Sequence, residues 1–319
     1  VLGALRAGLV CVNCNPMYTP RELEHQLNDS GAQAIVILEN FGKTLEEVIG
    51  RTKVKTVVTT RVGDLLGFPR SALVNSVVKY VKKAVPPFRL PGALPFGRVL
   101  SEGSGSRLAP PPLTLEDIAF LQYTGGTTGV SKGAMLTHGN LVANLLQVSA
   151  WVGPRVEEGG ETVIGALPLY HISALTASLC FMKLGANNVL IPNPRDMKGF
   201  VAELAKHPFS VLPGVNTLFN GLLNTPGFAQ LDFSHLKVAL GGGLAVQRAV
   251  AERWLEVTRS PLTEAYGLTE TSPGACFNPL VPGSSFNGTA GLPLPSPVAP
   301  VRDDHRHPPP PGPAGRVCL

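Results

Sequence analysis

The sequence predicts an α/β protein in which layered parallel sheets carry helices on both faces. Short apolar runs alternate with amphipathic segments along most of the chain, a pattern typical of parallel sheets. Hydrophobic residues make up 44% of the 319 residues, which is enough for a sizeable core. Only 15% of the residues are charged, while glycine (35) and proline (30) are abundant. This composition favours a loop-rich protein with buried strands over a helical bundle.

The first expected helix begins at a capping signal. The hydroxyl of Thr19 can accept a hydrogen bond from the amide three residues on, Glu22 can reach back, and Pro20 suits the first helical position. Gly31 ends this helix. The elements expected next are a strand at 34–38, a helix at 41–49 and a strand at 54–58.

The segment 65–101 contains no acidic residue and is rich in basic and apolar ones. Its basic residues are Arg70, Lys79, Lys82, Lys83, Arg89 and Arg98. Apolar residues recur at helical spacing at Leu73, Val74, Val77, Val78 and Val81. Two interpretations stay open: an exposed helix followed by a linker, or a surface that docks on an anionic membrane.

The strand and helix alternation continues in the second half of the chain. We first expect a strand at 117–121, a loop, and a helix near 140–146. Further strands are expected near Val163, at 189–191, near Val211 and near Val238. Further helices are expected from Ser173, at 197–206 after an Asp196 cap, and at 246–256. Apart from His171, the run 163–182 contains no residue that could be charged, and it has the length of a membrane span. Pro168 and its polar neighbours interrupt the run, so we interpret it as a strand and a buried core helix.

Residues 122–138, QYTGGTTGVSKGAMLTH, form a loop suited to wrap phosphate. Its glycines let the backbone approach an anion, its hydroxyls can donate hydrogen bonds, and Lys132 supplies positive charge. The loop of P-loop NTPases requires lysine directly after the last glycine. Here Lys132 follows Ser131, so that pattern is absent.

The same run resembles the phosphate loop of the adenylate-forming superfamily of acyl-CoA synthetases, adenylation domains and luciferases. Further segments match in the family's order: ALPLYHI at 166–172, GGG at 241–243, EAYGLTE at 264–270 and GTAGLP at 288–293. The segments NCNPMYTPREL at 13–23 and GVNTLFN at 214–220 look most like bacterial long-chain fatty acid CoA ligases. The resemblance covers residues 1 to about 292.

The resemblance implies an enzyme that joins a fatty acid to AMP with ATP and Mg²⁺, and then transfers the acyl group to coenzyme A. It implies magnesium contacts from Thr124 and Glu270, adenine stacking on Tyr266, and an acyl pocket lined by His171. The implied catalytic residues are Lys132, Thr269, Glu270 and His171. The other implied nucleotide contacts are Tyr123, Gly125, Gly126, Thr127, Thr128, Gly129, Ser131, Gly241, Gly242, Gly243, Glu264 and Gly267.

Simpler interpretations of these residues stay open: Glu270 could be a solvated carboxylate, Gly241–Gly243 a flexible turn, and His171 a core histidine. Two other functions also stay open: an adenylate-forming enzyme for another carboxylic acid, and a non-catalytic nucleotide- or acyl-binding remnant. Fatty acid, ATP and coenzyme A are the expected partners, with no nucleic acid, and the oligomeric state is left open.

We expect residues 1–292 to form a partial AMP-binding domain and the proline-rich residues 293–319 to form a disordered tail. Compared with the family, about 100 residues are missing at the start. The ribose-binding aspartate and the C-terminal domain with its lysine are missing at the end. A truncated or frame-shifted gene product with impaired turnover would look like this.

The net charge of +5 and the pI near 9.0 suit an anionic ligand or an anionic membrane surface. Five cysteines without a signal peptide favour a reducing compartment. We therefore expect a cytoplasmic protein, with peripheral contact at the inner face of the cytoplasmic membrane as the alternative. Cys11 and Cys14 form a C-x-x-C pair, which we interpret as buried small residues.

Overall fold

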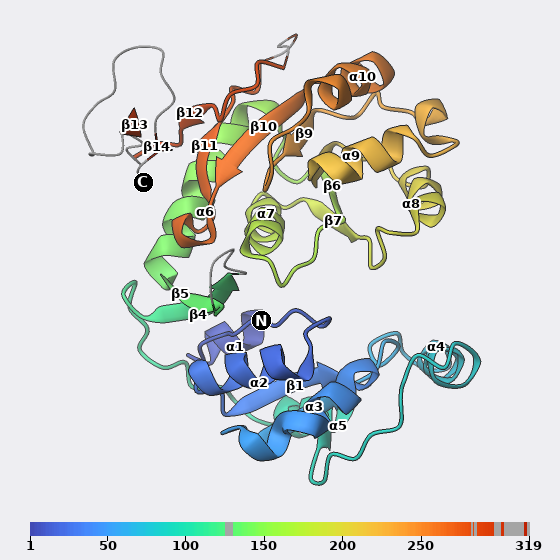
Figure 1. Cartoon of the computed structure of the whole chain (residues 1–319), viewed down its shortest axis with the longest axis vertical. Coiled ribbons are helices and arrows are strands. Elements are labelled where there is room, and N and C mark those ends of the chain that lie inside the picture. The colour runs from blue at the N-terminus through green and yellow to red at the C-terminus, as the bar shows by residue number, and fades with distance from the viewer. Residues whose placement is uncertain (125–129, 282, 284–285, 297–300, 303–315, 318–319) are drawn as a thin grey trace. The chain divides into compact units, whose positions relative to one another are not determined.

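A computed structural model of the chain describes residues 1–124, 130–281, 283, 286–296, 301–302 and 316–317 (Figure 1). The chain divides into two compact units. The first unit comprises Val1–Leu113 and Ile118–Met135, and the second comprises Thr114–Asp117 and Leu136–Leu319. The α/β class with parallel sheets is confirmed in both.

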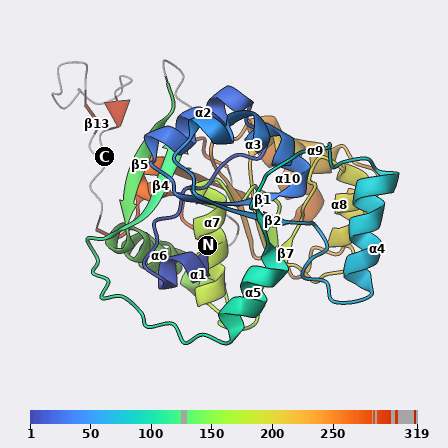
Figure 2. The same ribbon diagram turned by 90° about the horizontal axis from the view of Figure 1, so that it is seen from below.

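The first unit is built on a parallel three-stranded sheet in the order β1-β2-β3. Its strands are β1 (Ala34–Leu38), β2 (Thr56–Thr60) and β3 (Leu94–Pro95). Its helices are α1 (Leu2–Arg6), α2 (Pro20–Asp29), α3 (Gly42–Val48), α4 (Arg70–Ser76), which a π-helical turn (Val77–Val81) extends, and α5 (Phe96–Ser104). Figure 2 shows α2 and α3 on one side of β1 and β2, with α5 on the other.

The capping box predicted for the first helix is confirmed. The amide of Glu22 donates to Thr19 Oγ1 at 3.4 Å, and the amide of Thr19 donates to Glu22 Oε2 at 2.8 Å. The strand at 34–38 has the predicted bounds, whereas the second strand begins at Thr56, two residues later than expected. The core between α2, β1 and α3 consists of Leu23, Leu27, Ile35, Leu45 and Val48.

The segment after the phosphate loop differs from the prediction. We expected the loop to lead into a helix, but a strand comes first: β4 (Ile118–Thr124) pairs with β5 (Lys132–Thr137) in a two-stranded sheet. Helix α6 (His138–Val152) begins only after β5, where the amide of Asn140 donates to the Thr137 hydroxyl at 3.1 Å. The loop therefore follows a strand of this small sheet, and not a strand of a larger parallel sheet.

The second unit contains a seven-stranded sheet in the order β12-β11-β10-β9-β8-β6-β7. Its strands are β6 (Thr162–Gly165), β7 (Asn187–Leu190), β8 (Val211–Gly214), β9 (Val238–Gly241), β10 (Leu262–Gly267), β11 (Gly274–Phe277) and β12 (Leu292–Pro293). Strands β7, β6, β8, β9 and β10 pair in parallel, while β11 and β12 are antiparallel additions. A further pair, β13 (Val301–Arg302) and β14 (Arg316–Val317), follows.

Helices cover both faces of this sheet (Figure 1). On one face lie α8 (Met197–Leu204), α9 (Asn216–Leu223) and α10 (Arg248–Thr258), and on the other lie α6 and α7 (Ile172–Lys183). Alternation along the strands explains this. In β8, Leu212 joins the core with Phe219 and Trp254, while Val211 joins the core with Val148 and Phe181.

Residues 163–182 form most of β6, a turn and most of α7, as the prediction of a strand and a core helix requires. In the part of the chain that is described, no helix is long and apolar enough to cross a membrane. The Asp196 cap is confirmed, because Gly199 N donates to Asp196 Oδ1 at 3.0 Å. The helix expected from residue 246 begins at Arg248. Most of the expected tail, including 303–315, lies outside the described residues.

Candidate functional site

Several candidate segments lie at one edge of the seven-stranded sheet. Because β6, β8, β9 and β10 run parallel, their carboxyl ends share an edge. Residues 166–171 follow β6, residues 242–243 follow β9 and residues 268–270 follow β10. In open α/β sheets, nucleotides bind outside this edge. The second unit therefore brings the predicted acyl, adenine and phosphate segments to a common edge.

The glycines at the end of β9 are needed for close packing. A Cβ atom at Gly241 would lie 2.5 Å from Val246 Cγ2, and one at Gly242 would lie 3.0 Å from Ala265 O. Gly243 has a φ of 79°, in the left-handed region that favours glycine. This turn leaves bare backbone at the sheet edge, where a flat base could approach.

The turn after β10 is tighter still. A Cβ atom at Gly267 would overlap the carbonyl oxygen of Pro273. The amide of Leu268 donates to the Thr271 hydroxyl at 3.0 Å. These contacts fix the single 3₁₀ turn Thr269–Thr271 directly at the carboxyl end of β10.

Thr269 and Glu270 open this turn. Thr269 is half-buried, and the side chain of Glu270 is exposed. Hydroxyl and carboxylate oxygens are suitable partners for phosphate and Mg²⁺ respectively, and a nucleotide-bound Mg²⁺ commonly uses one or two protein carboxylates. Among the described residues, no group of three or more His, Cys, Asp or Glu side chains could hold a metal. The residue types at this turn fit the expected roles.

Tyr266 and Glu264 lie on β10 itself. Tyr266 is half-buried and pairs with Cys276 of β11, next to an irregularity in the register. Glu264 Oε1 accepts a hydrogen bond from Val246 N at 3.3 Å. Its Oε2 is buried without a hydrogen-bond partner among the described residues, and burial raises the pKa of Glu264.

His171 is the residue before α7, and its ring centroid lies 4.5 Å from that of Tyr170. Although the side chain is exposed, the surrounding chain removes part of its hydration and lowers the pKa of His171. The ring is therefore neutral near pH 7. A neutral ring is compatible with the predicted acyl-pocket role, which stays a prediction.

The phosphate loop belongs to the first unit, and its central residues Gly125, Gly126, Thr127, Thr128 and Gly129 lie outside the described residues. Both flanks are described. Thr124 ends β4, and the exposed Lys132 begins β5. The hydroxyl of Ser131 donates to the carbonyl oxygen of Thr124 at 2.6 Å, so it joins the two flanks. Tyr123, expected to contact nucleotide, is buried with 8% exposure.

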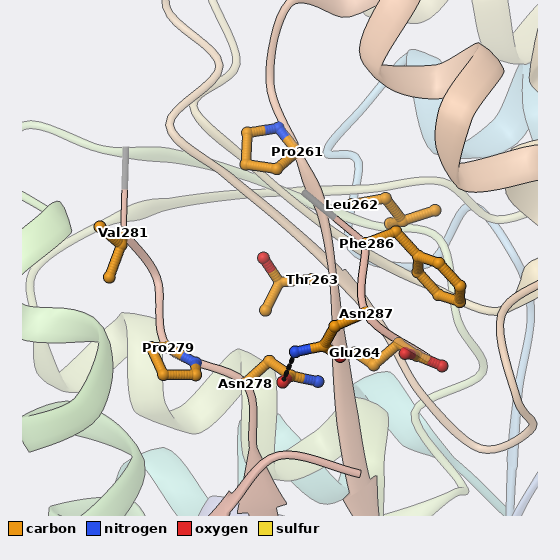
Figure 3. Close-up of a pocket in the computed structure, with 9 residues that line it drawn as sticks. All are labelled: Pro261, Leu262, Thr263, Glu264, Asn278, Pro279, Val281, Phe286 and Asn287. Atoms are coloured by element: carbon orange, nitrogen blue, oxygen red, sulfur yellow. Dashed lines mark hydrogen bonds between the residues drawn. The ribbon is translucent and has the colours of Figure 1, made fainter. Parts of the chain in front are cut away.

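A pocket of about 260 Å³ lies beside the amino-terminal part of β10 (Figure 3). Its lining residues are Pro261, Leu262, Thr263, Glu264, Asn278, Pro279, Val281, Phe286 and Asn287. Of the predicted site residues that the structure describes, only Glu264 lines it. The motif residues that follow Gly267 belong to the other end of the strand and do not line this pocket.

Asn144 supports the site but was not singled out from the sequence. It is buried in α6, where its Oδ1 accepts from Gly274 N at 3.0 Å and its Nδ2 donates to Gly274 O at 2.8 Å. Thr176 of α7 donates to Ser272 O at 3.4 Å. Both helices therefore anchor the segment that follows the Thr269–Thr271 turn. In the sequence, Asn144 and Thr176 are polar residues on otherwise apolar helix faces, and such buried polar groups usually have a hydrogen-bond partner.

The chain belongs to the AMP-binding enzyme family, whose model matches residues 1–319. It is 54% identical over 320 aligned positions to a long-chain-fatty-acid–CoA ligase of Escherichia coli O6:H1 (strain CFT073), covering 100% of this chain and 57% of that protein. It is 35% identical to a long-chain-fatty-acid–CoA ligase of Bacillus subtilis (strain 168), covering 92% of this chain and 52% of that protein. The chain thus spans little more than half the length of these relatives.

Solved structures show the same fold. The anthranilate CoA ligase AuaEII in complex with anthranoyl-AMP superposes with a TM-score of 0.83 at 22% identity, covering 99% of this chain and 56% of that one. A long-chain-fatty-acid–CoA ligase (FadD1) from Archaeoglobus fulgidus gives a TM-score of 0.71 at 25% identity, with coverage of 99% and 56%. The architecture described above is therefore that of the large domain of adenylate-forming enzymes.

Proposed function

We propose that this chain carries the ATP- and fatty-acid-binding core of a long-chain fatty acid–CoA ligase. The 54% identity to a protein of that name over the whole chain is the observation that carries the proposal. The gathering of the acyl, adenine and phosphate segments at one edge of the second unit's sheet supports it.

In the first half of the proposed reaction, a fatty carboxylate oxygen attacks the α-phosphorus of ATP. A bond forms between that oxygen and phosphorus, the bond to the leaving oxygen breaks, and pyrophosphate departs from the acyl-AMP. Both reactants are anions, so the site must reduce their repulsion. In the first unit, Lys132 offers positive charge, and Thr127 and Thr128 offer hydroxyl donors. In the second unit, Thr269 offers a hydroxyl donor.

In the second half, the sulfur of coenzyme A attacks the acyl carbonyl carbon. The carbon–oxygen bond to AMP breaks, AMP leaves with the electron pair, and the thiol proton is released. The products are an acyl thioester and AMP. Coenzyme A is therefore a co-substrate in this proposal, and no residue of the chain becomes acylated.

The remaining roles follow the residue types. In the first unit the hydroxyl of Thr124, and in the second unit the carboxylate of Glu270, are the proposed oxygen ligands for Mg²⁺, whose charge would screen the phosphates. The ring of Tyr266 would stack on adenine beside the glycine turn at 241–243. His171 would line the acyl pocket.

Pyrophosphate release by the purified chain tests this function, with Mg²⁺, ATP and a series of acids as substrates. We expect release with long-chain fatty acids and a loss of about 100-fold in Lys132→Ala, because one charge that stabilises the transition state is removed. Lys183→Ala, at the end of α7, is the matched control. Preference for aryl or amino acids would favour another adenylate-forming activity. Nucleotide binding without release would favour a non-catalytic binding protein.

We also propose that the region around α4 contacts an anionic membrane surface. Large apolar side chains are exposed there: Leu65 (75%), Phe68 (90%), Leu73 (66%), Tyr80 (70%) and Val81 (73%). They lie next to Lys79, Lys82 and Lys83, whose side chains are exposed, with no acidic residue between 65 and 101. Exposed apolar groups flanked by lysines are typical of surfaces that bind the lipid interface. Figures 1 and 2 both show α4 at the periphery of the first unit.

Flotation with vesicles that contain anionic lipid tests this contact. We expect the chain to float with the vesicles and the variant with Lys79, Lys82 and Lys83 changed to Glu to remain at the bottom, since each basic residue near the surface adds about 1 kcal/mol of attraction. A triple variant with Lys53, Lys55 and Lys43 changed to Glu controls for net charge. Equal flotation of all three proteins would exclude the surface around α4.

A further inference from the structure

One face of α2 contacts both flanks of the phosphate loop. His25 and Asp29 are four residues apart on this helix and therefore lie on the same face. His25 contacts Ser131, which comes after the loop, and Asp29 contacts Tyr123, which comes before it. All these residues belong to the first unit.

The contact to Ser131 defines the proton on the histidine ring. His25 Nε2 lies 2.9 Å from the carbonyl oxygen of Ser131. A carbonyl oxygen can only accept, so Nε2 must carry the hydrogen and donate it. The bond holds the backbone directly before Lys132. The ring also meets Tyr123 edge-on, with ring centroids 6.4 Å apart and an interplanar angle of 87°.

The contact to Tyr123 is a charge-assisted hydrogen bond. The phenol donates to Asp29 Oδ2 at 2.5 Å. A carboxylate oxygen accepts, so the phenol of Tyr123 is the donor in this contact. The bond fixes the residue directly before Thr124, the predicted magnesium ligand.

The two flanks also hold each other. Ser131 Oγ donates to Thr124 O at 2.6 Å, which closes the neck of the loop. A Cβ atom at Gly133 would lie 3.0 Å from the ring of Tyr123, so the ring packs directly against the start of β5. The two flanks of the loop, Tyr123–Thr124 and Ser131–Gly133, are thus held by each other and by one face of α2.

The helix that carries His25 and Asp29 is itself well anchored. Its capping box is complete, and Leu23 and Leu27 are buried. Gln26, which is also buried, donates to the carbonyl oxygen of Asn13 at 3.1 Å. These contacts anchor α2 to parts of the first unit other than the loop flanks.

We propose that His25 and Asp29 are positioning residues that hold the two flanks of the phosphate loop at a fixed separation, so that Thr124 and Lys132 are presented to a polyphosphate. The inference rests on the proposed function for its ligand. That α2 holds the two flanks of the loop is inferred from its contacts alone and does not depend on the ligand.

Backbone hydrogen exchange of the full chain, followed by mass spectrometry of peptides covering 120–135, tests whether α2 holds the two flanks without any ligand. We expect His25→Ala to raise exchange at residues 131–133 about tenfold, as loss of one hydrogen bond predicts. Asp29→Ala should raise it at 123–124. His25→Gln and Asp29→Asn keep a donor and an acceptor respectively, so they should restore most of the protection.

Glu24→Ala is the matched control, because it removes an exposed ion pair with Arg51 from another face of the same helix. It should leave exchange at 120–135 unchanged. Unchanged exchange in both His25→Ala and Asp29→Ala would overturn the proposal. So would an equal rise across all of α2 and β1, which would indicate general loosening of the unit.

Calorimetric titration with Mg²⁺ and ATP separates this inference from the proposed function. If the wild-type chain binds ATP, His25→Ala and Asp29→Ala should each weaken binding at least severalfold, with recovery in the Gln and Asn variants. Unchanged affinity in the alanine variants would refute the positioning role. Absence of binding by the wild type, with the exchange results as expected, would refute the nucleotide function but not the role of α2 in holding the two flanks.

Discussion

Gly267 shows how closely backbone segments approach one another at the candidate site. Its Cα faces the carbonyl oxygen of Pro273, which leaves no space for a side chain. The adjacent residues Thr269 and Glu270 are positioned by this approach, because the same turn carries them. An added Cβ atom at position 267 would therefore disturb both the stability of the fold and the positions of the proposed phosphate and metal contacts.

We predict that Gly267→Ala lowers the free energy of unfolding by about 1–3 kcal/mol, the usual range for overpacking. The new Cβ would overlap a backbone oxygen, which cannot rotate away as a flexible side chain would. Chemical denaturation at pH 7 measures the change.

Gly103→Ala is the control for this substitution. Gly103 lies in α5, and, apart from its chain neighbours and the local helix backbone, no atom of the described residues lies within 4 Å of the position that a Cβ atom would take there. Alanine at this position should be neutral or should stabilise by about 0.5–1 kcal/mol. Equal stability of the Gly267→Ala variant and the wild type would show that the turn can open without cost.

At the scale of elements, an ion pair joins the starts of two strands of the large sheet. Glu161 directly precedes β6 and Lys237 directly precedes β9. Lys237 Nζ lies 2.7 Å from Glu161 Oε1, and the glutamate side chain is fully buried. Burial alone would raise the pKa of Glu161, but hydrogen bonds from Lys237, Ser210 and the amide of Glu157 lower it from its ordinary value.

We predict that Lys237→Met lowers the free energy of unfolding at pH 7 by about 2–4 kcal/mol, because a buried carboxylate loses its charged partner. A folded-state pKa below the unfolded value stabilises the protein above the unfolded pKa, and this contribution disappears as pH falls through the folded pKa. The difference between wild type and variant should therefore shrink in acid. Denaturation curves at pH 7 and near pH 4 measure it.

Lys206→Met provides the comparison, since its ion pair with Glu203 is exposed to solvent and should contribute much less than the buried pair. Similar losses in the two lysine variants, or a loss in Lys237→Met that does not depend on pH, would contradict the role assigned to the buried pair.

Individual helices and strands could be predicted where their signals are local in the sequence. Strong local signals, such as the Thr19–Glu22 capping box and the apolar run of β1, gave correct elements. The strand β5 was missed because KGAMLT has no β-branched run and contains a glycine, so only its pairing with β4 makes it a strand.

The candidate site was predictable in part for a similar reason. Motifs that are continuous in sequence, such as 264–270, could be identified directly. The contacts of His25 with Ser131 and of Asn144 with Gly274 join residues more than 100 positions apart. No local pattern contains that information, because tertiary folding creates these pairs.

At the scale of the whole molecule, the chain has two units that each carry part of the family's motif set. The phosphate-loop flanks Thr124, Ser131 and Lys132 belong to the first unit, and the glycine turn at 241–243 with Tyr266, Thr269 and Glu270 belongs to the second. The model of the AMP-binding enzyme family matches residues 1–319 and so spans both units.

The proposed function requires that this chain binds the adenylate of a long-chain fatty acid. Calorimetric titration of the purified chain with a non-hydrolysable long-chain acyl-AMP analogue measures this binding. We expect saturable binding that Tyr266→Ala weakens about tenfold or more, as loss of stacking on a base predicts, while Tyr80→Ala on the exposed π-helical turn leaves it unchanged. No binding by the wild-type chain, or equal affinity in the Tyr266→Ala variant, would contradict the claim.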